Sequence, residues 1–118
     1  MNLNHVHLGS CDLAASRAFY ERYFAFRHRA NHGQGVFLEN EDGFLLALDP
    51  VDAVPALPAW FHLGFCLRDG HAVRELPARM LADGVELATE LRDFGDEAVA
   101  FYCLDPAGYR PEVSWHAD

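Results

Sequence analysis

The sequence predicts an α+β fold built from two βαβββ modules, because its two halves repeat one order of elements. Each half opens with a short strand that carries a histidine, His5 in the first half and His62 in the second. A helical segment follows, and each half closes with a hairpin, around Asp42-Gly43 in one case and Asp105-Pro106-Ala107-Gly108 in the other. Matching turns after matching periodicities indicate a supersecondary unit that is used twice.

The first module, from residue 1 to about residue 49, is expected to hold one strand, one helix and three further strands. Residues 4–9 alternate like a strand, and Asp12 is a suitable N-cap for a helix that ends at Phe24. Ala25 follows this helix, at a cost of roughly 1 kcal/mol if the position requires a left-handed conformation. The remaining strands are expected near residues 26–29, 35–39 and 44–48, the last two joined by a polar turn.

The second module, from about residue 59 to residue 118, is expected to repeat that order. Residues 50–58 contain three prolines and are interpreted as the linker between the modules of a single domain. A strand is expected at 60–67, then a helix that ends at Asp83 with Gly84 as its C′ residue, then strands near 85–88, 98–104 and 109–115. Pro77 inside the helical segment predicts a kink or a split, because proline has no N–H to donate.

The composition argues against several classes of function. The formal net charge is −9, and all nine basic residues are arginines without a basic cluster, which argues against nucleic acid or anionic membrane partners. The three cysteines have irregular spacing and no CxxC, so neither a disulfide framework nor a zinc knuckle is indicated, and a reducing cytoplasm is the expected location. No apolar run approaches ~18 residues and no leader is evident, so neither a membrane span nor secretion is expected.

His5, His62 and Glu112 form a candidate set of metal ligands. Aligning the glycines of the two hairpin turns places Ala47 opposite Glu112. The pseudo-twofold would then bring two imidazoles and one carboxylate to equivalent depths in one cavity, with a fourth place vacant. Such a set with open positions suits a catalytic divalent metal; Fe(II) fits it best, while Mn(II), Ni(II) and Zn(II) are also compatible.

The two-residue period of a strand places each of these three side chains on the polar face of its strand. A lone strand histidine is more often a core residue than a ligand, but two at repeat-equivalent positions with a carboxylate favour a metal site. His7 shares a face with His5, so it is interpreted as an acid/base, as a hydrogen-bond partner of a substrate oxygen, or as a structural residue. The other histidines that lie in polar or turn-like sequence are expected to be solvated: His28, His32 and His71.

Together these motifs resemble the vicinal oxygen chelate superfamily, which includes glyoxalase I, fosfomycin-resistance transferases, extradiol dioxygenases, methylmalonyl-CoA epimerase and the metal-free bleomycin-binding proteins. The resemblance spans essentially the whole chain. It is carried by Leu3-Asn4-His5-Val6, Asp12-Leu13, Phe19-Tyr20, His62, Asp83-Gly84-Val85, and Phe101-Tyr102 through Asp105-Pro106-x-Gly108 to Glu112. It implies the glyoxalase/bleomycin resistance/dioxygenase fold, with a curved, cup-shaped mixed sheet, and in short members a homodimer.

Individual members of that superfamily fit to different degrees. Tyr102 stands ten residues before Glu112, a spacing similar to that of extradiol dioxygenases, so it is a candidate proton donor; the alternative is a place in the barrel wall. The histidine that the dioxygenase pattern has before this tyrosine is missing, and His7 is the candidate to replace it. Glyoxalase I carries a second glutamate where this chain has Ala47, which disfavours that isomerisation unless Asp49 takes the role.

These expectations combine into one function and one rival. The expected function is a cytoplasmic, homodimeric metalloenzyme of dioxygenase or lyase type, whose small substrate chelates the metal through vicinal oxygens, with Tyr102 and His7 as catalytic residues. The rival is a non-catalytic protein of the bleomycin-resistance type that sequesters an aromatic or cationic compound. Metal content separates the two.

Overall fold

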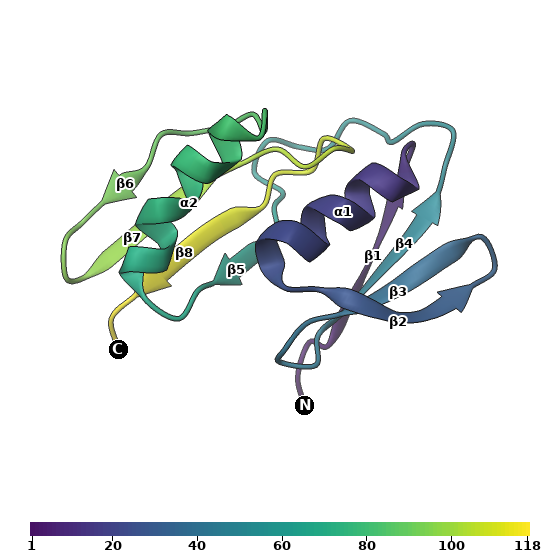
Figure 1. Ribbon diagram of the computed structural model, residues 1–118, viewed down its shortest axis with the longest axis horizontal. Coiled ribbons are helices and arrows are strands. Elements are labelled where there is room, and N and C mark those ends of the chain that lie inside the picture. Colours follow the sequence, from purple (N-terminus) through teal and green to yellow (C-terminus); the bar gives the residue numbers. More distant parts are fainter. The chain divides into compact units, whose positions relative to one another are not determined.

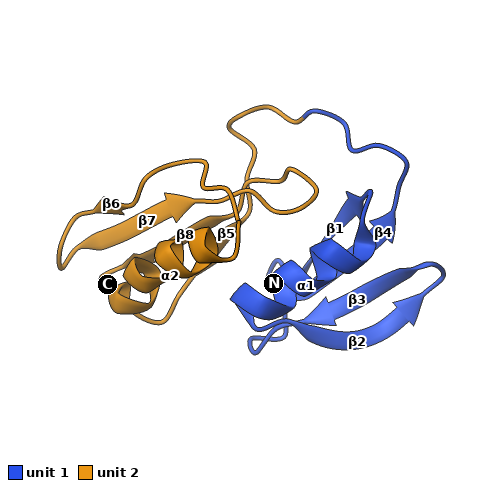
Figure 2. Cartoon of the chain, turned by 45° about the horizontal axis from the view of Figure 1, so that its top comes forward, with its two compact units in different colours: residues 1–56 blue, residues 57–118 orange.

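The computed structural model describes all 118 residues, which form two compact units, residues 1–56 and 57–118 (Figure 2). Unit 1 contains one helix and four strands: β1 (His5–Ser10), α1 (Leu13–Phe24), β2 (Arg27–His32), β3 (Gly35–Glu39) and β4 (Leu45–Pro50). Unit 2 contains the same set: β5 (Gly64–Cys66), α2 (Gly70–Ala82), β6 (Arg92–Asp93), β7 (Ala98–Tyr102) and β8 (Glu112–His116) (Figure 1).

The two units share one sheet topology. The strand order is β1-β4-β3-β2 in unit 1 and β5-β8-β7-β6 in unit 2. In each unit the first strand pairs in parallel with the last strand, and the other pairs are antiparallel. The prediction of an α+β fold made of two βαβββ modules is therefore confirmed.

The core of unit 1 lies between α1 and one face of its sheet. The Asp12 carboxylate accepts a hydrogen bond from the Ala15 amide at 3.0 Å and caps the helix as predicted. Ala25 ends the helix in the left-handed region with φ 56°, so the expected strain is present. Buried aromatic rings pack together on both sides of Ala25 in the sequence; the ring centroids of Tyr20 and Phe26 lie 6.0 Å apart, edge to face. Burial of these rings offsets the cost at Ala25.

The core of unit 2 lies between α2 and the corresponding face of its sheet. Val73 and Met80 on the helix, and Phe101 and Val113 on the strands, are 0% exposed. Helix α2 runs through Pro77 from Gly70 to Ala82 without the split that was one expected outcome. Gly84 follows the helix with φ 85°, as expected for a C′ glycine.

Several predicted strand boundaries are wrong. Residues 85–88 form no strand and contribute only a bridge between Leu87 and Cys103, because the amides of both Ala88 and Thr89 donate to the Tyr102 carbonyl and interrupt a regular ladder. The strand that pairs with β7 at this edge of the sheet is instead the short β6. β5 is limited to Gly64–Cys66, and β4 extends to Pro50, into the segment expected to link the modules.

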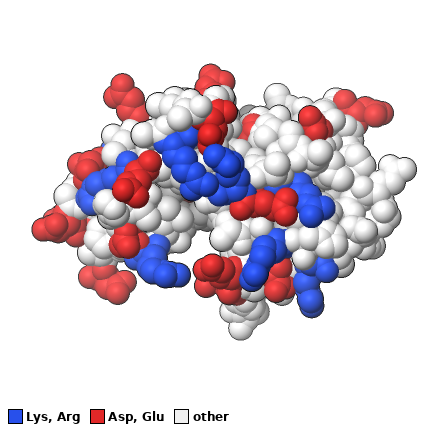
Figure 3. Space-filling view, viewed as in Figure 1, with Lys and Arg blue, Asp and Glu red and all other residues white.

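The charged side chains do not form a single patch of one sign on the face in Figure 3, where Arg residues are interspersed with Asp and Glu. Neither of the two helices has the length and apolar composition needed to cross a bilayer.

Candidate functional site

Glu112 lies in a row of side chains across the sheet of unit 2. The strand register pairs it with Gly64 on β5 and with Tyr102 on β7. Residues directly opposite one another on paired strands share a face. The neighbours of this row, Phe101 and Val113, are fully buried toward α2, so Glu112 and Tyr102 lie on the opposite face, which we call the open face of the sheet.

The corresponding row in unit 1 consists of His7 on β1, Ala47 on β4 and Phe37 on β3. Ala47 therefore occupies in β4 the place that Glu112 occupies in β8, in agreement with the equivalence inferred from the hairpin glycines. Leu46 and Leu48, on either side of Ala47, are buried on the face that meets α1. The predicted alternation of faces is thus present in both units.

His62 lies just before β5 rather than within a strand, and its ring is held in a defined orientation. Nδ1 lies 3.1 Å from the Trp60 carbonyl oxygen. Because a carbonyl only accepts, Nδ1 must carry the proton, and the neutral ring has its lone pair on Nε2. Nε2 lies 3.8 Å from Oε1 of Glu112, and both side chains are partly exposed. The lone pair and the carboxylate of this pair are thus available to the same cation.

The spacing of the His62/Glu112 pair is close to that of two ligands of one divalent ion. Zinc-type ions bind imidazole nitrogen and carboxylate oxygen at roughly 2.0–2.2 Å in tetrahedral geometry, so two donors to one ion lie about 3.4 Å apart. The observed separation of 3.8 Å is slightly wider. The hydrogen bond from Nδ1 to a backbone carbonyl is the usual support of a metal-binding histidine. No group of three or more His, Cys, Asp and Glu side chains is arranged to hold a metal. The structure brings His62 and Glu112 together in unit 2, and a metal site there stays a prediction.

His5 belongs to unit 1, and its ring makes a hydrogen bond through the same nitrogen as His62. Its Nδ1 lies 2.7 Å from Oδ1 of Asn4, which leaves the Nε2 lone pair free in the neutral ring. His5 is exposed at the start of β1. The two repeat-equivalent histidines thus share one tautomer. That His5 completes a three-ligand set with His62 and Glu112 stays a prediction.

Tyr102 lies against both members of the pair in unit 2. Its ring meets the His62 ring edge to face, with centroids 5.1 Å apart. Burial raises the pKa of Tyr102, a hydrogen bond to Glu112 and the charge of that carboxylate raise it further, and the positive charges of Arg92 and Arg110 oppose the shift. A phenol with a raised pKa stays protonated at neutral pH and can donate a hydrogen bond. Its catalytic role stays a prediction.

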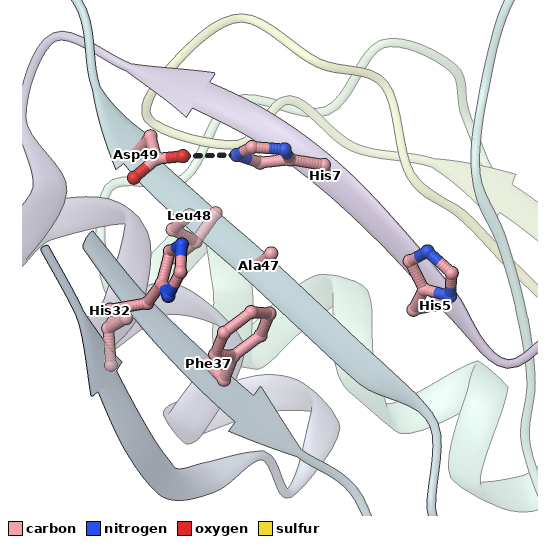
Figure 4. Close-up of a pocket in the computed structure, with 8 residues that line it drawn as sticks. His5, His7, His32, Phe37, Ala47, Leu48 and Asp49 are labelled. Carbon is pink, nitrogen blue, oxygen red and sulfur yellow. Dashed lines mark hydrogen bonds and ion pairs between the residues drawn. The ribbon is translucent and has the colours of Figure 1, made fainter.

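Unit 1 contains a cavity of about 260 Å³ on the open face of its own sheet (Figure 4). Nε2 of His7 is hydrogen-bonded to the Asp49 carboxylate across one edge of this cavity. His7 therefore uses the nitrogen that His5 and His62 leave free, which distinguishes it from the proposed ligands. The residues that line the cavity are His5, His7, His32, Val36, Phe37, Ala47, Leu48 and Asp49.

Three histidines were expected to be solvated, and His32 departs from this in part. His28 is exposed and contacts Asn31, and His71 is exposed in a pair with Glu75. His32 is also exposed, but its ring lies 5.5 Å from that of Phe37 and lines the cavity. The sequence contained no signal for this position, because a β-bulge between His28 and Ala30 changes the alternation along β2.

Comparisons with known proteins agree with this architecture. The family model described as Glyoxalase/Bleomycin resistance protein/Dioxygenase superfamily matches residues 2–113. No curated protein matches the chain.

Solved structures give matches over the full chain. A possible glyoxalase from Bacillus cereus is 29% identical with a TM-score of 0.82, and the match covers 96% of this chain and 97% of that one. The fosfomycin resistance protein FosX from Listeria monocytogenes is 21% identical with a TM-score of 0.85, covering 99% and 94%. A lactoylglutathione lyase from Agrobacterium tumefaciens is 25% identical with a TM-score of 0.70, covering 97% and 92%.

The family model covers nearly all of the chain, and the module order found in the structure is the one that the resemblance implied. The chain therefore belongs to the glyoxalase/bleomycin resistance protein/dioxygenase superfamily.

Proposed function

We propose that this protein is a divalent-metal-dependent enzyme that acts on a small molecule with two neighbouring oxygens. The observation that carries the proposal is the His62/Glu112 pair, whose two donor atoms face each other at 3.8 Å while Nδ1 of His62 is occupied by the Trp60 carbonyl. His5, with the same tautomer, is proposed as the third protein ligand, from the same chain or from a second copy in a homodimer. Fe(II) is favoured, with Mn(II), Ni(II) and Zn(II) as alternatives.

The residues around the pair suit chemistry of dioxygenase or lyase type. A bound divalent ion supplies Lewis acidity to the ligand's vicinal oxygens. Tyr102, protonated at neutral pH and opposite Glu112 on the paired strand, donates a proton on the open face. His7 is the second candidate for proton transfer, and Asp49 orients its ring through Nε2. Ala47 supplies no second carboxylate at the position equivalent to Glu112.

Metal content tests the proposal directly. Protein purified without chelator or affinity-tag metal is expected to retain about one divalent ion per chain by elemental analysis. Glu112→Ala and His62→Ala are each expected to lower metal affinity by about 100-fold or more, because each removes one bond to the ion. The fold should persist by circular dichroism, since both side chains lie partly exposed on the open face.

The chain offers a matched control in His71 and Glu75, an exposed His/Glu pair on α2 with Nε2 and Oε1 3.1 Å apart. His71→Ala is expected to leave metal affinity unchanged. Metal retained at full stoichiometry by Glu112→Ala would reject the ligand assignment. Wild-type protein that binds no divalent metal would instead favour the non-catalytic binding protein.

A further inference from the structure

A half-buried arginine lies beside the His62/Glu112 pair. Cζ of Arg110 is 5.8 Å from the centroid of the Tyr102 ring, so the guanidinium lies on the open face of unit 2. Its Nη1 donates to the Ala59 carbonyl at 2.6 Å. These two contacts hold the long side chain in one place next to the proposed metal pair, which lowers the entropic cost of using it to bind a ligand.

The guanidinium of Arg110 has no carboxylate partner. Its contacts are the Ala59 carbonyl and the Tyr102 ring, and no Asp or Glu oxygen lies within 4.0 Å. Four of its five N–H donors are therefore without a protein acceptor. Carboxylates are not scarce, since the chain has 18 acidic residues and nine arginines. Other arginines do pair, as Arg74 does with Asp93.

A second arginine approaches Tyr102 from the other side. Arg92 on β6 lies opposite Ala100 of β7, two residues from Tyr102, so the three side chains share the open face. Since β7 lies between β6 and β8, Arg92 lies on the side of Tyr102 away from Glu112. Arg92 is exposed and forms no ion pair. Both charges act on the Tyr102 phenol, whose pKa they lower against the larger opposing effects of burial and Glu112.

The repeat shows that this cation is not required by the fold. The residue two positions before Ala47 in unit 1 is Leu45, whereas the residue two positions before Glu112 in unit 2 is Arg110. The same backbone position thus accepts an apolar side chain. A half-buried charge without a counter-ion costs solvation energy, and a bound anion would restore that energy.

We propose that Arg110, assisted by Arg92, binds an anionic oxygen group of the ligand, a carboxylate or phosphate-like group, beside the vicinal oxygens. This inference rests on the proposed function and narrows the substrate class from small molecules with vicinal oxygens to anionic ones. The planar guanidinium presents a fork of donors that matches two oxyanion oxygens, which a lysine at that position could not reproduce.

The test compares two ligands that differ only in charge, 3,4-dihydroxybenzoate and 3,4-dihydroxybenzamide. Both have vicinal oxygens, and the charged group lies too far along the ring to join the same chelate. Binding is measured by anaerobic calorimetry on Zn(II)-loaded protein, because Zn(II) has no redox chemistry of its own. The variants are Arg110→Gln, Arg110→Lys and Arg92→Gln. The control is Arg27→Gln, which removes an exposed arginine on β2 of unit 1 that also lacks an ion pair.

Arg110→Gln is expected to weaken benzoate binding by about tenfold and benzamide binding by less than twofold, because a charge-assisted hydrogen bond to the carboxylate is lost. Arg110→Lys should recover part of the benzoate affinity, and Arg92→Gln should weaken it by about threefold. Arg27→Gln should leave the affinity for both ligands unchanged. Equal losses for benzoate and benzamide in Arg110→Gln, or no loss for either, would overturn the inference.

A second experiment, on metal-free protein, distinguishes failure of this inference from failure of the proposed function. Inorganic phosphate is titrated into apo protein and followed by ³¹P NMR. If the wild type fails to bind metal, the proposed function fails, but weaker phosphate binding in Arg110→Gln and unchanged binding in Arg27→Gln would still support the anion subsite. Phosphate binding that is the same in the wild type and in Arg110→Gln would reject the subsite whatever the metal result.

Discussion

The two units have the same sheet order and the same strand register, but their open faces carry different chemistry. The central row of unit 2 is Gly64, Glu112 and Tyr102, a carboxylate between a glycine and a phenol. The central row of unit 1 places a methyl group and a phenyl ring, from Ala47 and Phe37, where unit 2 has those two polar groups.

The polar side chains on the open face of unit 1 lie beside Ala47 rather than at its position. His7 occupies the place of Gly64 in the row, and its ring bonds to Asp49, two residues beyond Ala47 (Figure 4). The repeated backbone therefore determines which positions face the open side. The side chains at those positions decide whether the row presents a carboxylate and a phenol or a hydrogen-bonded His/Asp pair.

The largest expected effect concerns the missing carboxylate at Ala47. An enzyme that isomerises a hemithioacetal by proton transfer needs a base opposite the metal carboxylate. We expect wild-type turnover of the glutathione hemithioacetal of methylglyoxal to be negligible, and Ala47→Glu to raise it by at least tenfold, as measured by absorbance of the thioester product. Ala47→Gln has the same size without the charge and serves as control. Wild-type kcat/KM of roughly 10⁴ M⁻¹s⁻¹ or more would show that another residue, Asp49 or His7, acts as the base.

The next effect concerns one glycine in each unit. A Cβ on Gly35 would lie 2.5 Å from the Leu48 carbonyl oxygen and closer still to the Asp49 carboxylate, whereas a Cβ on Gly64 would make an ordinary 3.7 Å contact with Glu112. Gly35→Ala is therefore expected to lower the free energy of unfolding by about 1–3 kcal/mol, because the β3/β4 backbone must shift. Gly64→Ala should stay within about 0.5 kcal/mol of the wild type. Urea unfolding measures both, and equal losses would contradict the difference in packing.

A smaller effect concerns the phenol in the unit 2 row. The raised pKa of Tyr102 depends in part on Glu112, so Glu112→Gln is expected to lower it, while Arg110→Gln is expected to raise it further by removing an opposing charge. Phe37→Tyr places a phenol opposite Ala47 rather than a carboxylate, and its pKa should lie below that of Tyr102. NMR titration of ¹³Cζ-labelled tyrosine measures each of these pKa values. A Tyr102 pKa that is unchanged in Glu112→Gln would refute the contact with Glu112.

The smallest effect concerns an exposed ion pair on each unit. Arg74 and Asp93 form two contacts at 2.8 and 3.0 Å, whereas Arg29 and Glu39 form one at 3.3 Å. The hydrogen bond from Arg74 and that from the Gly95 amide lower the pKa of Asp93 from 3.8 to about 2. Because the folded-state pKa is depressed, the stabilisation is present above about pH 4 and is lost as the pH falls toward 2.

Asp93→Asn is accordingly expected to lower the Tm at about pH 6 and to converge with the wild type near pH 2. Glu39→Gln should change the Tm less at about pH 6, because a single exposed contact contributes little. Thermal unfolding followed by circular dichroism at several pH values checks both. A Tm difference for Asp93→Asn that stays constant from about pH 6 to pH 2 would contradict the depressed pKa.

Much of the fold could be predicted because it depends on local patterns. The alternation along β1 and β8 placed His5, His7 and Glu112 on the open faces, and Asp12 and Gly84 were recognised from their positions at helix ends. Aligning the glycines of the two hairpin turns was enough to identify Ala47 as the residue of the first module equivalent to Glu112. Each of these inferences uses the period of one element or the chemistry of one turn, which neighbouring residues determine.

The sequence by itself determined the module order, the polar faces and the identity of the candidate ligands, and only the tertiary structure decided which contacts those side chains make. That His62 is bonded through Nδ1 to Trp60, that His7 is bonded through Nε2 to Asp49, and that Arg110 has no counter-ion were not predictable. Such contacts depend on the course of irregular segments and join residues up to 51 positions apart in the chain. Their geometry follows from register and local packing, which no sequence period encodes.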